Sequence, residues 1–428
     1  MLASDSIRPV GVSGMPNTAS HVQGARVLCV GGGIEQVPII RLAQQMGLHV
    51  TAIDSNPRAA GLSVADRGSA VDLRNLDAVT RLAAAAEICA LLPSPLGAIL
   101  TTAGAVNDAL RLRGISHAAA HLCTDKRATH RCLAEAGIPT PKSAMAATGL
   151  EITETAETTI GFPAVVKPMS GSGSRGVFVA RSKAELLRWL PWHLEQRLRT
   201  SLPECTIVEQ YIAGQEVGVD GVVVDQAYAS LLIRDKEVTD MPFRLPYAFL
   251  APSYLCEGAQ RQISETLAAA VAALKLRDCL VHADVILALD GTAYVVDVSG
   301  RPSGFSISTR MVPSATGVDS IRQAIRLSLG SAASFQPLYQ RGAVLRMLSA
   351  PRGRLRSVEG FDEVRQMPGV VAAETFLHPG EPIEERRTGA SYATGYLLTS
   401  AATRDQASAL WEQAASVIHF SVDSEVPR

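Results

Sequence analysis

The first part of the chain alternates short apolar runs with amphipathic stretches. Arg26 to Val30 is an apolar run that leads into Gly31-Gly32-Gly33, and a helical pattern then reaches Gln45. A second apolar run, Val50 to Ile53, ends at Asp54. Apolar runs of this length with an amphipathic stretch between them predict two buried strands joined by a helix, which is a βαβ unit.

Two later segments continue this pattern. Ala98 to Thr102 is typical of a further strand, and Asn107 to Arg113 of a helix packed on the same sheet. We therefore expect a Rossmann-like domain over residues 25–120. A leader rich in Ser, Pro and Gly, residues 1–24, precedes it and is expected to be disordered.

The glycine turn at Gly31 allows two interpretations. A glycine turn followed about twenty residues later by an acid is the dinucleotide fingerprint, and Asp54 supplies that acid. Gln36, however, stands where the third glycine of the fingerprint belongs. We favour a domain that shapes a substrate cleft at its strand ends, and a nicotinamide-dependent oxidoreductase remains the alternative.

A lysine at the end of a strand and a loop of small residues follow each other in the middle of the chain. Ala164 to Val166 predicts a short strand that ends at Lys167 and is stopped by Pro168. The loop comprises Ser170, Gly171, Ser172, Gly173 and Ser174, with Gly176 before a strand at Val177 to Ala180. Backbone N–H groups of such a loop can approach an anion closely. The pattern predicts a flap over a phosphate; a Gly/Ser hairpin loop beside a solvent-reaching lysine is the alternative.

Elements on both sides of this loop predict a small α+β lid at about residues 140–212. A helix begins at Thr124-Asp125-Lys126 and is stopped by Gly137. Another begins at Ser182, which has Glu185 three residues later as in a capping box. Thr206 to Glu209 then predicts a strand, so a strand, a helix and a strand surround the loop.

Two strands that flank Asp290-Gly291 predict a hairpin with carboxylates on one face. Counting back from a two-residue loop places Asp284 opposite Asp297 and His282 opposite Ser299. Two carboxylates about 5 Å apart destabilise a sheet, so a positive charge is expected beside them. A phosphate flap next to such a pair indicates Mg²⁺, whereas a salt bridge between Asp297 and Arg301 is the alternative.

The other face of this hairpin is expected to belong to the core. Its residues are Val281, Ala283, Val285, Leu287, Tyr294, Val296 and Val298. Beyond Leu329 the strands Ala343 to Leu348, Val370 to Phe376 and Tyr392 to Thr399, and a helix capped by Thr403, predict a last α+β domain over residues 331–428. This region has no chemical motif of its own.

Composition excludes several classes of partner. Lysine and arginine total 40 against 41 acidic residues, so no net field favours nucleic acid or an anionic membrane. The seven cysteines form no Cys-x-x-Cys pair, which argues against zinc and a disulfide framework and fits a reducing cytoplasm. No apolar run approaches the length of a membrane span. We expect small-molecule partners.

At this point the residues resemble the ATP-grasp superfamily of carboxylate–amine ligases from Arg26 onward. The resemblance rests on Lys167 with its loop, the spacing of Glu209, Gly214 and Glu216, and Asp284 with Asp297-x-Ser-x-Arg301. Pro351-Arg-Gly-Arg354, Val358-Glu-Gly360 and Pro368-Gly-Val-Val371 are similar to the terminal domain of L-amino acid ligases, which make dipeptides. The fold implied is α/β: a Rossmann-like domain, a small α+β lid, an antiparallel-sheet catalytic domain within residues 121–330, and a C-terminal α+β domain.

The resemblance implies roles for residues of this chain. Lys167 and Lys126 would hold nucleotide phosphates under Ser170 to Gly176. Glu209, Gln210, Tyr211 and Ile212 would line the adenine, and Glu216 would bind the ribose. Asp284 and Asp297, with Ser299, would hold one or two Mg²⁺ ions, for which Mn²⁺ could substitute. Arg301 would meet the transferring phosphoryl group, and His282 would tune the site or orient substrate unless it is a packed histidine.

The implied reaction joins a small carboxylate, such as an amino acid, to an amine through an acyl phosphate, with ATP converted to ADP and phosphate. Asp297 and Ser299 depart from the Glu-x-Asn-x-Arg that usually ends the metal strand of the family. A nucleotide-binding homologue with weak or no turnover is therefore a further alternative. Substrate specificity is expected at Arg234 to Tyr254 and Ser303 to Arg310, where Arg244 or Arg310 could bind a carboxylate. A homodimer is a possible assembly.

Overall fold

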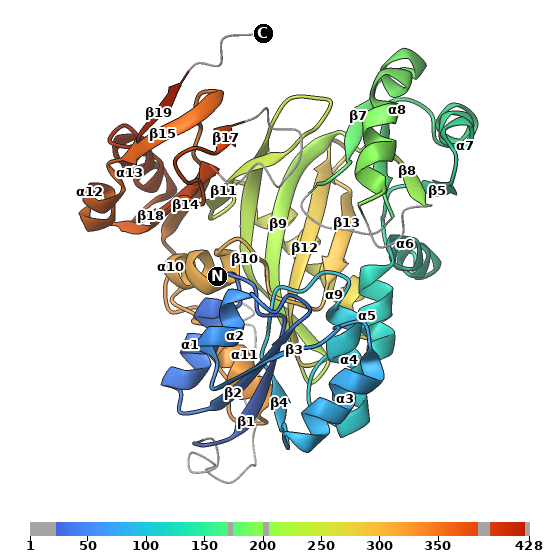
Figure 1. Cartoon of the computed structure of the whole chain (residues 1–428). Coiled ribbons are helices and arrows are strands. Elements are labelled where there is room, and N and C mark those ends of the chain that lie inside the picture. Colours follow the sequence, from blue (N-terminus) through green and yellow to red (C-terminus); the bar gives the residue numbers. More distant parts are fainter. Residues whose placement is uncertain (1–22, 170–173, 200–204, 384–393, 424–428) are drawn as a thin grey trace, which may run out of the picture.

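The computed structural model describes residues 23–169, 174–199, 205–383 and 394–423. Figure 1 shows an N-terminal α/β unit below a long central sheet, with a small α+β unit to one side of it and the C-terminal elements to the other. The expected leader, the predicted flap residues Ser170, Gly171, Ser172 and Gly173, and the start of the strand predicted at Tyr392 lie outside the described residues.

The N-terminal unit is built on a parallel sheet with the strand order β3-β2-β1-β4. Its elements are β1 (Arg26–Val30), α1 (Val37–Gln45), β2 (His49–Asp54), α2 (Ala60–Val64), β3 (Arg67–Ala70), α3 (Leu76–Ala85), β4 (Ala90–Leu91), α4 (Leu100–Leu110) and α5 (His117–Thr124). The predicted βαβ opening is confirmed, because β1 pairs in parallel with β2 and α1 connects them.

The strand predicted at Ala98 to Thr102 is wrong. This segment leads into α4, whose Leu100, Ala103 and Val106 are buried at helical spacing. The fourth strand of the sheet is β4, which the sequence interpretation missed. A short apolar run fits a strand and a buried helix equally, so periodicity alone could not decide between them. The helix predicted at Asn107 to Arg113 overlaps only the end of α4, which stops at Leu110.

The small α+β unit follows helix α6 (Lys126–Glu135), which begins where a helix was predicted; Asp125 caps it by accepting a hydrogen bond from the Ala128 N–H at 3.0 Å. Its elements are β5 (Ser143–Ala146), α7 (Gly149–Glu154), the π-helix η1 (Thr155–Ile160), β6 (Ala164–Pro168), β7 (Phe178–Ala180), α8 (Lys183–Arg197) and β8 (Thr206–Gln210). The strands form one sheet in the order β5-β8-β6-β7. The unit agrees with the expected lid.

The central sheet has the strand order β13-β12-β9-β10-β11-β14-β18-β16. Its strands are β9 (Gly214–Val224), β10 (Ala227–Val238), β11 (Pro246–Ala251), β12 (Cys279–Ala288), β13 (Ala293–Ser299), β14 (Gly342–Met347), β16 (Val370–Glu374) and β18 (Tyr396–Ala401), and α9 (Glu257–Ala273) packs on it. One hydrophobic core joins this sheet to the N-terminal unit, from Leu28 through α4 and α9 to Val298.

The hairpin of β12 and β13 has the predicted pairing at the carboxylates. Asp284 pairs with Asp297 and His282 with Ser299. The turn is longer than a two-residue loop, because Leu287 pairs with Ala293, but a bulge at Val296 shifts the register back before Asp297. The two departures cancel on the side of the carboxylates.

The same bulge corrects the predicted core face of the hairpin. Ala293 and Val295 are buried, whereas Tyr294 and Val296, which were predicted to lie in the core, are only partly buried. Val296 instead lines the large cavity described below. A bulge inserts one residue and reverses the alternation beyond it, and nothing in the local sequence specifies its position.

The last part of the chain packs onto the central sheet. It contains η2 (Ile307–Met311), α10 (Val312–Thr316), α11 (Ser320–Ser328), α12 (Phe361–Gln366), α13 (Arg404–Ala415) and a small sheet of β17 (Pro382–Ile383), β15 (Gly353–Glu359) and β19 (His419–Asp423). The strands β14, β16 and β18 and helix α13 were predicted; β15, β17, β19 and α12 were not. All seven cysteines are free thiols. None of the helices in the described part of the chain has the length and apolar character that crossing a membrane requires.

Candidate active site

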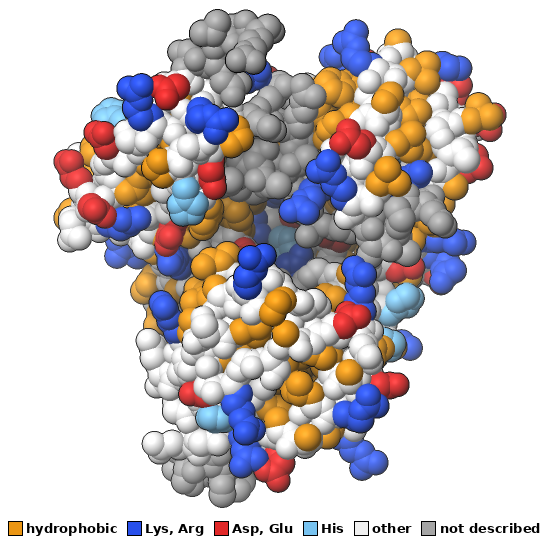
Figure 2. Space-filling model, viewed as in Figure 1, with side chains coloured by type: hydrophobic (Ala, Val, Ile, Leu, Met, Phe, Trp, Pro, Cys, Tyr) orange, Lys and Arg blue, Asp and Glu red, His pale blue; other side chains and the backbone are white. Residues whose placement is uncertain are grey.

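A cavity of about 1130 Å³ opens where the N-terminal unit, the lid and the central sheet meet. Figure 2 shows this hollow with lysine and arginine side chains around its rim. Its lining includes these predicted site residues: Lys126, Lys167, Ser174, Glu209, Gln210, Tyr211, Ile212, Glu216, His282, Asp284, Asp297, Ser299 and Arg301. Gly176 lies beside it, with a φ of 72° and its carbonyl 2.6 Å from Nδ1 of His193.

Three cations come to the cavity from three parts of the chain. Lys126 is the first residue of α6, Lys167 lies near the end of β6, and Arg301 follows β13. Burial lowers the pKa of Lys126, and the neighbouring charges of Lys167 and Arg301 act in the same direction. Cations crowded in a partly dehydrated site favour an anionic ligand, because its charge would relieve their repulsion.

Glu209 binds two basic side chains. Its Oε2 lies 2.7 Å from Nζ of Lys167, and its Oε1 lies 2.9 Å from Nε2 of His130. Burial opposes ionisation of this carboxyl, but Lys167 and His130 outweigh it and lower the pKa of Glu209 to about 2. The residue was expected to line an adenine site; it lines the cavity, and its carboxylate contacts these two side chains. His130 was missed; its position four residues after Lys126 on one helix face was the available signal.

The carboxylate pair carries a lysine that was not predicted. Lys236, on β10, places its Nζ 3.0 Å from Oδ1 of Asp284. Burial opposes ionisation, but Lys236 holds the pKa of Asp284 well below its usual range. A positive charge was expected beside the pair, and it is Lys236 that contacts Asp284. Arg301 donates from Nη1 to the carbonyl of Pro302 at 3.1 Å.

The residues on this face suit an ion that takes few protein ligands. Among the described residues no group of three or more His, Cys, Asp or Glu side chains could enclose a metal. Asp284 and Asp297 nevertheless pair directly across the hairpin, beside Ser299, and all three face the cavity. Mg²⁺ is commonly held by one or two carboxylates, with phosphate oxygens and water completing its octahedron. The site therefore fits Mg²⁺ bound together with a phosphorylated ligand.

Both arginines considered as carboxylate anchors already have acidic partners. Nη2 of Arg244 lies 2.7 Å from Oε1 of Glu216, the predicted ribose ligand, and its guanidinium stands 5.8 Å from the ring centre of Tyr211. Nη1 of Arg310 lies 2.8 Å from Oε1 of Glu374. Glu374 belongs to β16, so the last part of the chain, for which no chemical role was predicted, contributes to the wall of the cavity.

His282 belongs to a hydrogen-bond network beneath the cavity. Its Nδ1 lies 2.8 Å from Oγ of Ser303, whose hydroxyl donates to Asp220 at 2.5 Å. Arg234, which is fully buried, donates from Nε to the same Asp220 at 3.0 Å. Because Ser303 uses its proton on Asp220, Nδ1 of His282 must donate to Ser303. Burial lowers the pKa of His282 to about 4, so the ring is neutral at physiological pH and Nε2 is left as an acceptor.

The expected specificity segment, Ser303 to Arg310, is held from both sides. The backbone N–H of Phe305 donates to Oε1 of Glu35, in the loop after β1, at 2.5 Å. Oγ of Ser306 lies 2.7 Å from the hydroxyl of Tyr396 on β18. Phe305 and Ser306 both have φ near +60°, a conformation that non-glycine residues hold only when their surroundings enforce it.

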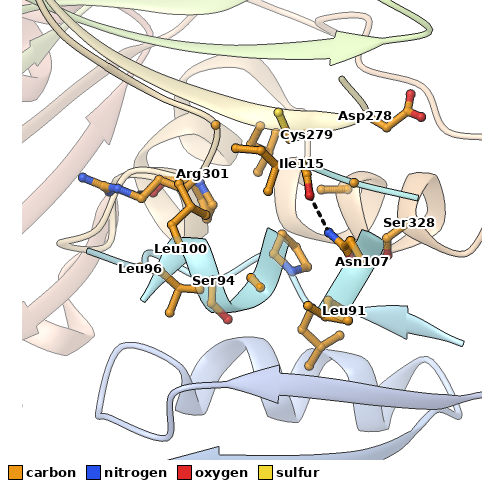
Figure 3. Close-up of a pocket in the computed structure, with 18 of the residues that line it drawn as sticks. Leu91, Ser94, Leu96, Leu100, Asn107, Ile115, Asp278, Cys279, Arg301 and Ser328 are labelled. Carbon is orange, nitrogen blue, oxygen red and sulfur yellow. Dashed lines mark hydrogen bonds between the residues drawn. The ribbon is translucent and has the colours of Figure 1, made fainter. Parts of the chain in front are cut away.

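A second, small cavity of about 70 Å³ lies behind Arg301, between α4 and the start of β12. Figure 3 shows Asn107 donating from Nδ2 to the carbonyl of Ile115, at 3.0 Å, on one side of it. Oδ1 of Asn107 is buried and has no hydrogen-bond partner among the residues that the structure describes. The space has room for a few water molecules, and a water there would satisfy this oxygen.

The glycine turn of β1 is closed by Asp54. The N–H of Gly32 donates to Oδ2 of Asp54 at 2.7 Å, and the N–H of Asn56 donates to Oδ1, also at 2.7 Å. Both carboxylate oxygens therefore bind the backbone of their own domain, which leaves the acid poorly suited to the ribose of a nicotinamide cofactor.

Comparisons with known proteins agree with this arrangement. Residues 160–310 match the ATP-grasp domain, and residues 346–423 match the L-amino acid ligase C-terminal domain 2. The protein y4rH of Sinorhizobium fredii is 27% identical over 391 residues, covering 90% of this chain and 80% of that protein.

Solved structures extend the likeness to nearly the whole fold. The L-amino acid ligase from Bacillus licheniformis superposes with a TM-score of 0.81 at 20% identity, over 94% of this chain and 100% of that one. The biotin carboxylase domain of the Hydrogenobacter thermophilus 2-oxoglutarate carboxylase, solved with MgADP, ADP and bicarbonate, superposes with a TM-score of 0.71 at 17% identity, over 93% and 91%.

Residues 160–310 thus form an ATP-grasp domain, and the predicted ATP-grasp fold of the chain is confirmed. The C-terminal region is similar to a domain of the L-amino acid ligases, and the fold agrees with that of a solved L-amino acid ligase.

Proposed function

We propose that this protein is an ATP-dependent ligase that joins a small carboxylate, an amino acid being the leading candidate, to an amine. The reaction would form an acyl phosphate and ADP, and the amine would then displace phosphate to give an amide or dipeptide. The observation that carries the proposal is one cavity in which Lys126, Lys167 and Arg301 lie near the paired carboxylates Asp284 and Asp297.

The chain's own residues account for charge at the phosphates. Lys126 and Lys167 would bind nucleotide phosphate oxygens, and Arg301 would stabilise the negative charge that develops on the transferring phosphoryl group. Asp284 and Asp297, with Ser299, would hold Mg²⁺, which supplies further charge neutralisation and orientation at the phosphates. Gln210, Tyr211 and Ile212 would border the adenine, and Glu216 with Arg244 the ribose.

The remaining residues would orient the second half of the reaction. Neutral His282 has an acceptor at Nε2, so it can hold a donor group such as the attacking amine, while Ser303 and Asp220 keep its ring in place. The segment Ser303 to Arg310 would face the small substrates. The walls of the cavity would exclude water, to which an acyl phosphate is labile.

The proposal is tested by incubating the protein with ATP, Mg²⁺ and pairs of amino acids, and by measuring ADP, phosphate and product mass. ADP and a condensed product are expected, with Mn²⁺ able to replace Mg²⁺. AMP and pyrophosphate in place of ADP would refute the acyl-phosphate route. Tight ATP binding without phosphate release for any pair would favour a nucleotide-binding homologue without turnover, the alternative that the Asp297 and Ser299 replacements raise.

Free cysteines are compatible with a reducing compartment, which supports the expectation of a cytoplasmic protein. The division of the chain into domains at about residues 120 and 330, and a homodimeric assembly, remain predictions.

A further inference from the structure

Lys236 is a largely buried lysine beside the carboxylate pair. It lines the cavity, and its side chain is 10% exposed. Its ammonium group lies 3.0 Å from Oδ1 of Asp284. Asp284 is also one of the two carboxylates proposed to hold Mg²⁺. The acidic partner of Lys236 in the unliganded protein would therefore bind a second cation in the loaded one.

The central sheet gives Lys236 room to reach this carboxylate across a neighbouring strand. Gly218, on β9, pairs with Asp284 on β12 and with Arg234 on β10. Lys236 follows Arg234 by two residues, so both side chains leave the same face of β10. A Cβ at Gly218 would overlap the guanidinium of Arg234. The missing side chain at Gly218 thus lets the basic side chains of β10 lie over β9, on the floor of the cavity.

Lys236 and a metal ion compete for Asp284. Burial opposes ionisation of this carboxyl, and Lys236 is the largest of the influences that outweigh burial. Once Asp284 and Asp297 hold a divalent ion, their charge is neutralised and the nearby ammonium is repelled. A buried ammonium that loses its partner needs another anion, because an unpaired buried charge is costly.

Most other basic side chains that line the cavity have acidic partners or proposed phosphate contacts. Lys126, Lys167 and Arg301 are assigned to the phosphates, whereas Arg234, Arg244 and Arg310 pair with Asp220, Glu216 and Glu374. Arg41 and Arg175 are exposed. The proposed reaction brings one more anion to the metal face, namely the carboxylate that receives the phosphoryl group. This carboxylate must lie close to Arg301 and the carboxylate pair.

We propose that Lys236 binds the carboxylate of the substrate that becomes the acyl phosphate, and that it leaves Asp284 for this carboxylate when Mg²⁺ is bound. The inference rests on the proposed function and names a substrate ligand within it. The exchange keeps the ammonium paired in both states. It also makes binding ordered, because Asp284 holds the ammonium until the metal site is filled.

The first test measures KM from the rate of ADP release, with the pair of amino acids that gives the fastest release. The amino acid found at the N-terminus of the product is the one whose carboxylate was activated. Lys236→Met should raise the KM of this amino acid about tenfold or more, because a charged hydrogen bond is lost. The KM values of ATP and of the other amino acid should change by less than about twofold. Lys236→Arg, which keeps the charge, should recover part of the loss.

Lys183→Met is the matched control. Lys183 forms a pair of the same kind with Glu157, at 2.9 Å, on the exposed surface of the lid. Loss of this exposed pair should leave every KM at its wild-type value.

A titration with Mg²⁺ alone, followed by the melting temperature, distinguishes a substrate ligand from a mere support of Asp284. Lys236→Met should need about three- to tenfold less Mg²⁺ for half-saturation, because the competing ammonium is gone. A lysine that only positions Asp284 would give the opposite sign. Calorimetry on the wild type needs no variant to fold: the activated amino acid should bind in the presence of Mg²⁺ and ADP, and much more weakly with ADP alone.

An unchanged KM of the activated amino acid in Lys236→Met would overturn the inference and leave the ligase proposal intact. Weaker Mg²⁺ binding by this variant would also overturn it, as would equal affinity of the wild type for the amino acid with and without Mg²⁺. Absence of ADP release by the wild type with every pair of amino acids would refute the proposed function itself, and the inference with it.

Discussion

Replacing Asp297 by Asn separates a metal site from an ordinary ion pair. Asp297 faces Asp284 directly, and Lys236 neutralises only part of the negative charge, by its contact with Asp284. The amide removes one of two like charges, which is worth about 0.2–1 kcal/mol in favour of the unliganded fold. For a chain of this size the melting temperature should rise by no more than about 2 °C.

Catalysis should respond far more strongly than stability. A neutral amide is a poorer Mg²⁺ ligand, and the loss of about 3 kcal/mol of electrostatic stabilisation in the transition state lowers kcat about 100-fold. The rate of ADP release measures kcat, and melting curves with and without Mg·ATP measure stability and ligand affinity, since a ligand raises the melting temperature by an amount that grows with the logarithm of its affinity. Asp297→Asn should lose most of the upward shift that Mg·ATP gives the wild type.

Asp290→Asn provides the matched control. Asp290 lies in the turn of the same hairpin, is exposed, and accepts a hydrogen bond from the Thr292 N–H that an Asn side chain can also accept. This variant should keep the wild-type shift. If Asp297→Asn instead melts several degrees lower without ligand and still gains the full shift from Mg·ATP, Asp297 is a structural partner and the metal assignment is wrong.

Three further predictions follow from contacts at the cavity and the lid. Lys236→Met leaves the facing carboxylates without their contacting cation, so the stability of the unliganded protein should fall by about 1–3 kcal/mol. Millimolar Mg²⁺ should then stabilise the variant more than it stabilises the wild type, and equal Mg²⁺ responses in melting curves would contradict this. Burial lowers the pKa of His193 to about 4, so on acidification the unfolded chain takes up a proton before the folded protein does, and stability should fall by up to about 3 kcal/mol from about pH 6.5 to about pH 4. Urea titrations should show a shallower loss of stability with falling pH for His193→Gln than for the wild type, and parallel losses would refute the assignment. Tyr396→Phe removes the hydroxyl bound to Ser306 but keeps the ring beside Phe305, so the KM of one small substrate should change by about three- to tenfold while ADP affinity stays constant. A change in ADP affinity would argue against a substrate role for the segment Ser303 to Arg310.

Local patterns predicted the elements that carry the chemistry. The strand ending at Lys167, the helix beginning at Lys126 and the Asp290-Gly291 turn all depend on residues close together in the chain, and each is present. The pairing of Asp284 with Asp297 was also right, although the counting behind it assumed a regular hairpin. A longer turn and the bulge at Val296 cancelled, and neither has a local signal.

Contacts between distant segments could not be predicted from the sequence. Lys236 meets Asp284 because β9 stands between their two strands and is paired with both. His130 meets Glu209 because α6 packs beside the lid sheet. Glu35 meets Phe305 across the cavity. A single sequence holds no record of which side chains become neighbours in this way, so the partners of the predicted residues remained unknown even where the residues themselves were identified.

The eight-stranded sheet limits how this protein could be taken apart or recombined. The strands β14, β18 and β16 continue, by backbone hydrogen bonds, the same sheet that ends with the carboxylate hairpin. Deleting the chain after Leu329 would expose the whole edge of β11, and such an edge invites pairing with other chains and aggregation. The C-terminal region is thus unsuited to transplantation as a module. Chimeras that replace the part of the cavity wall containing Glu374 need to retain the register of β14 against β11.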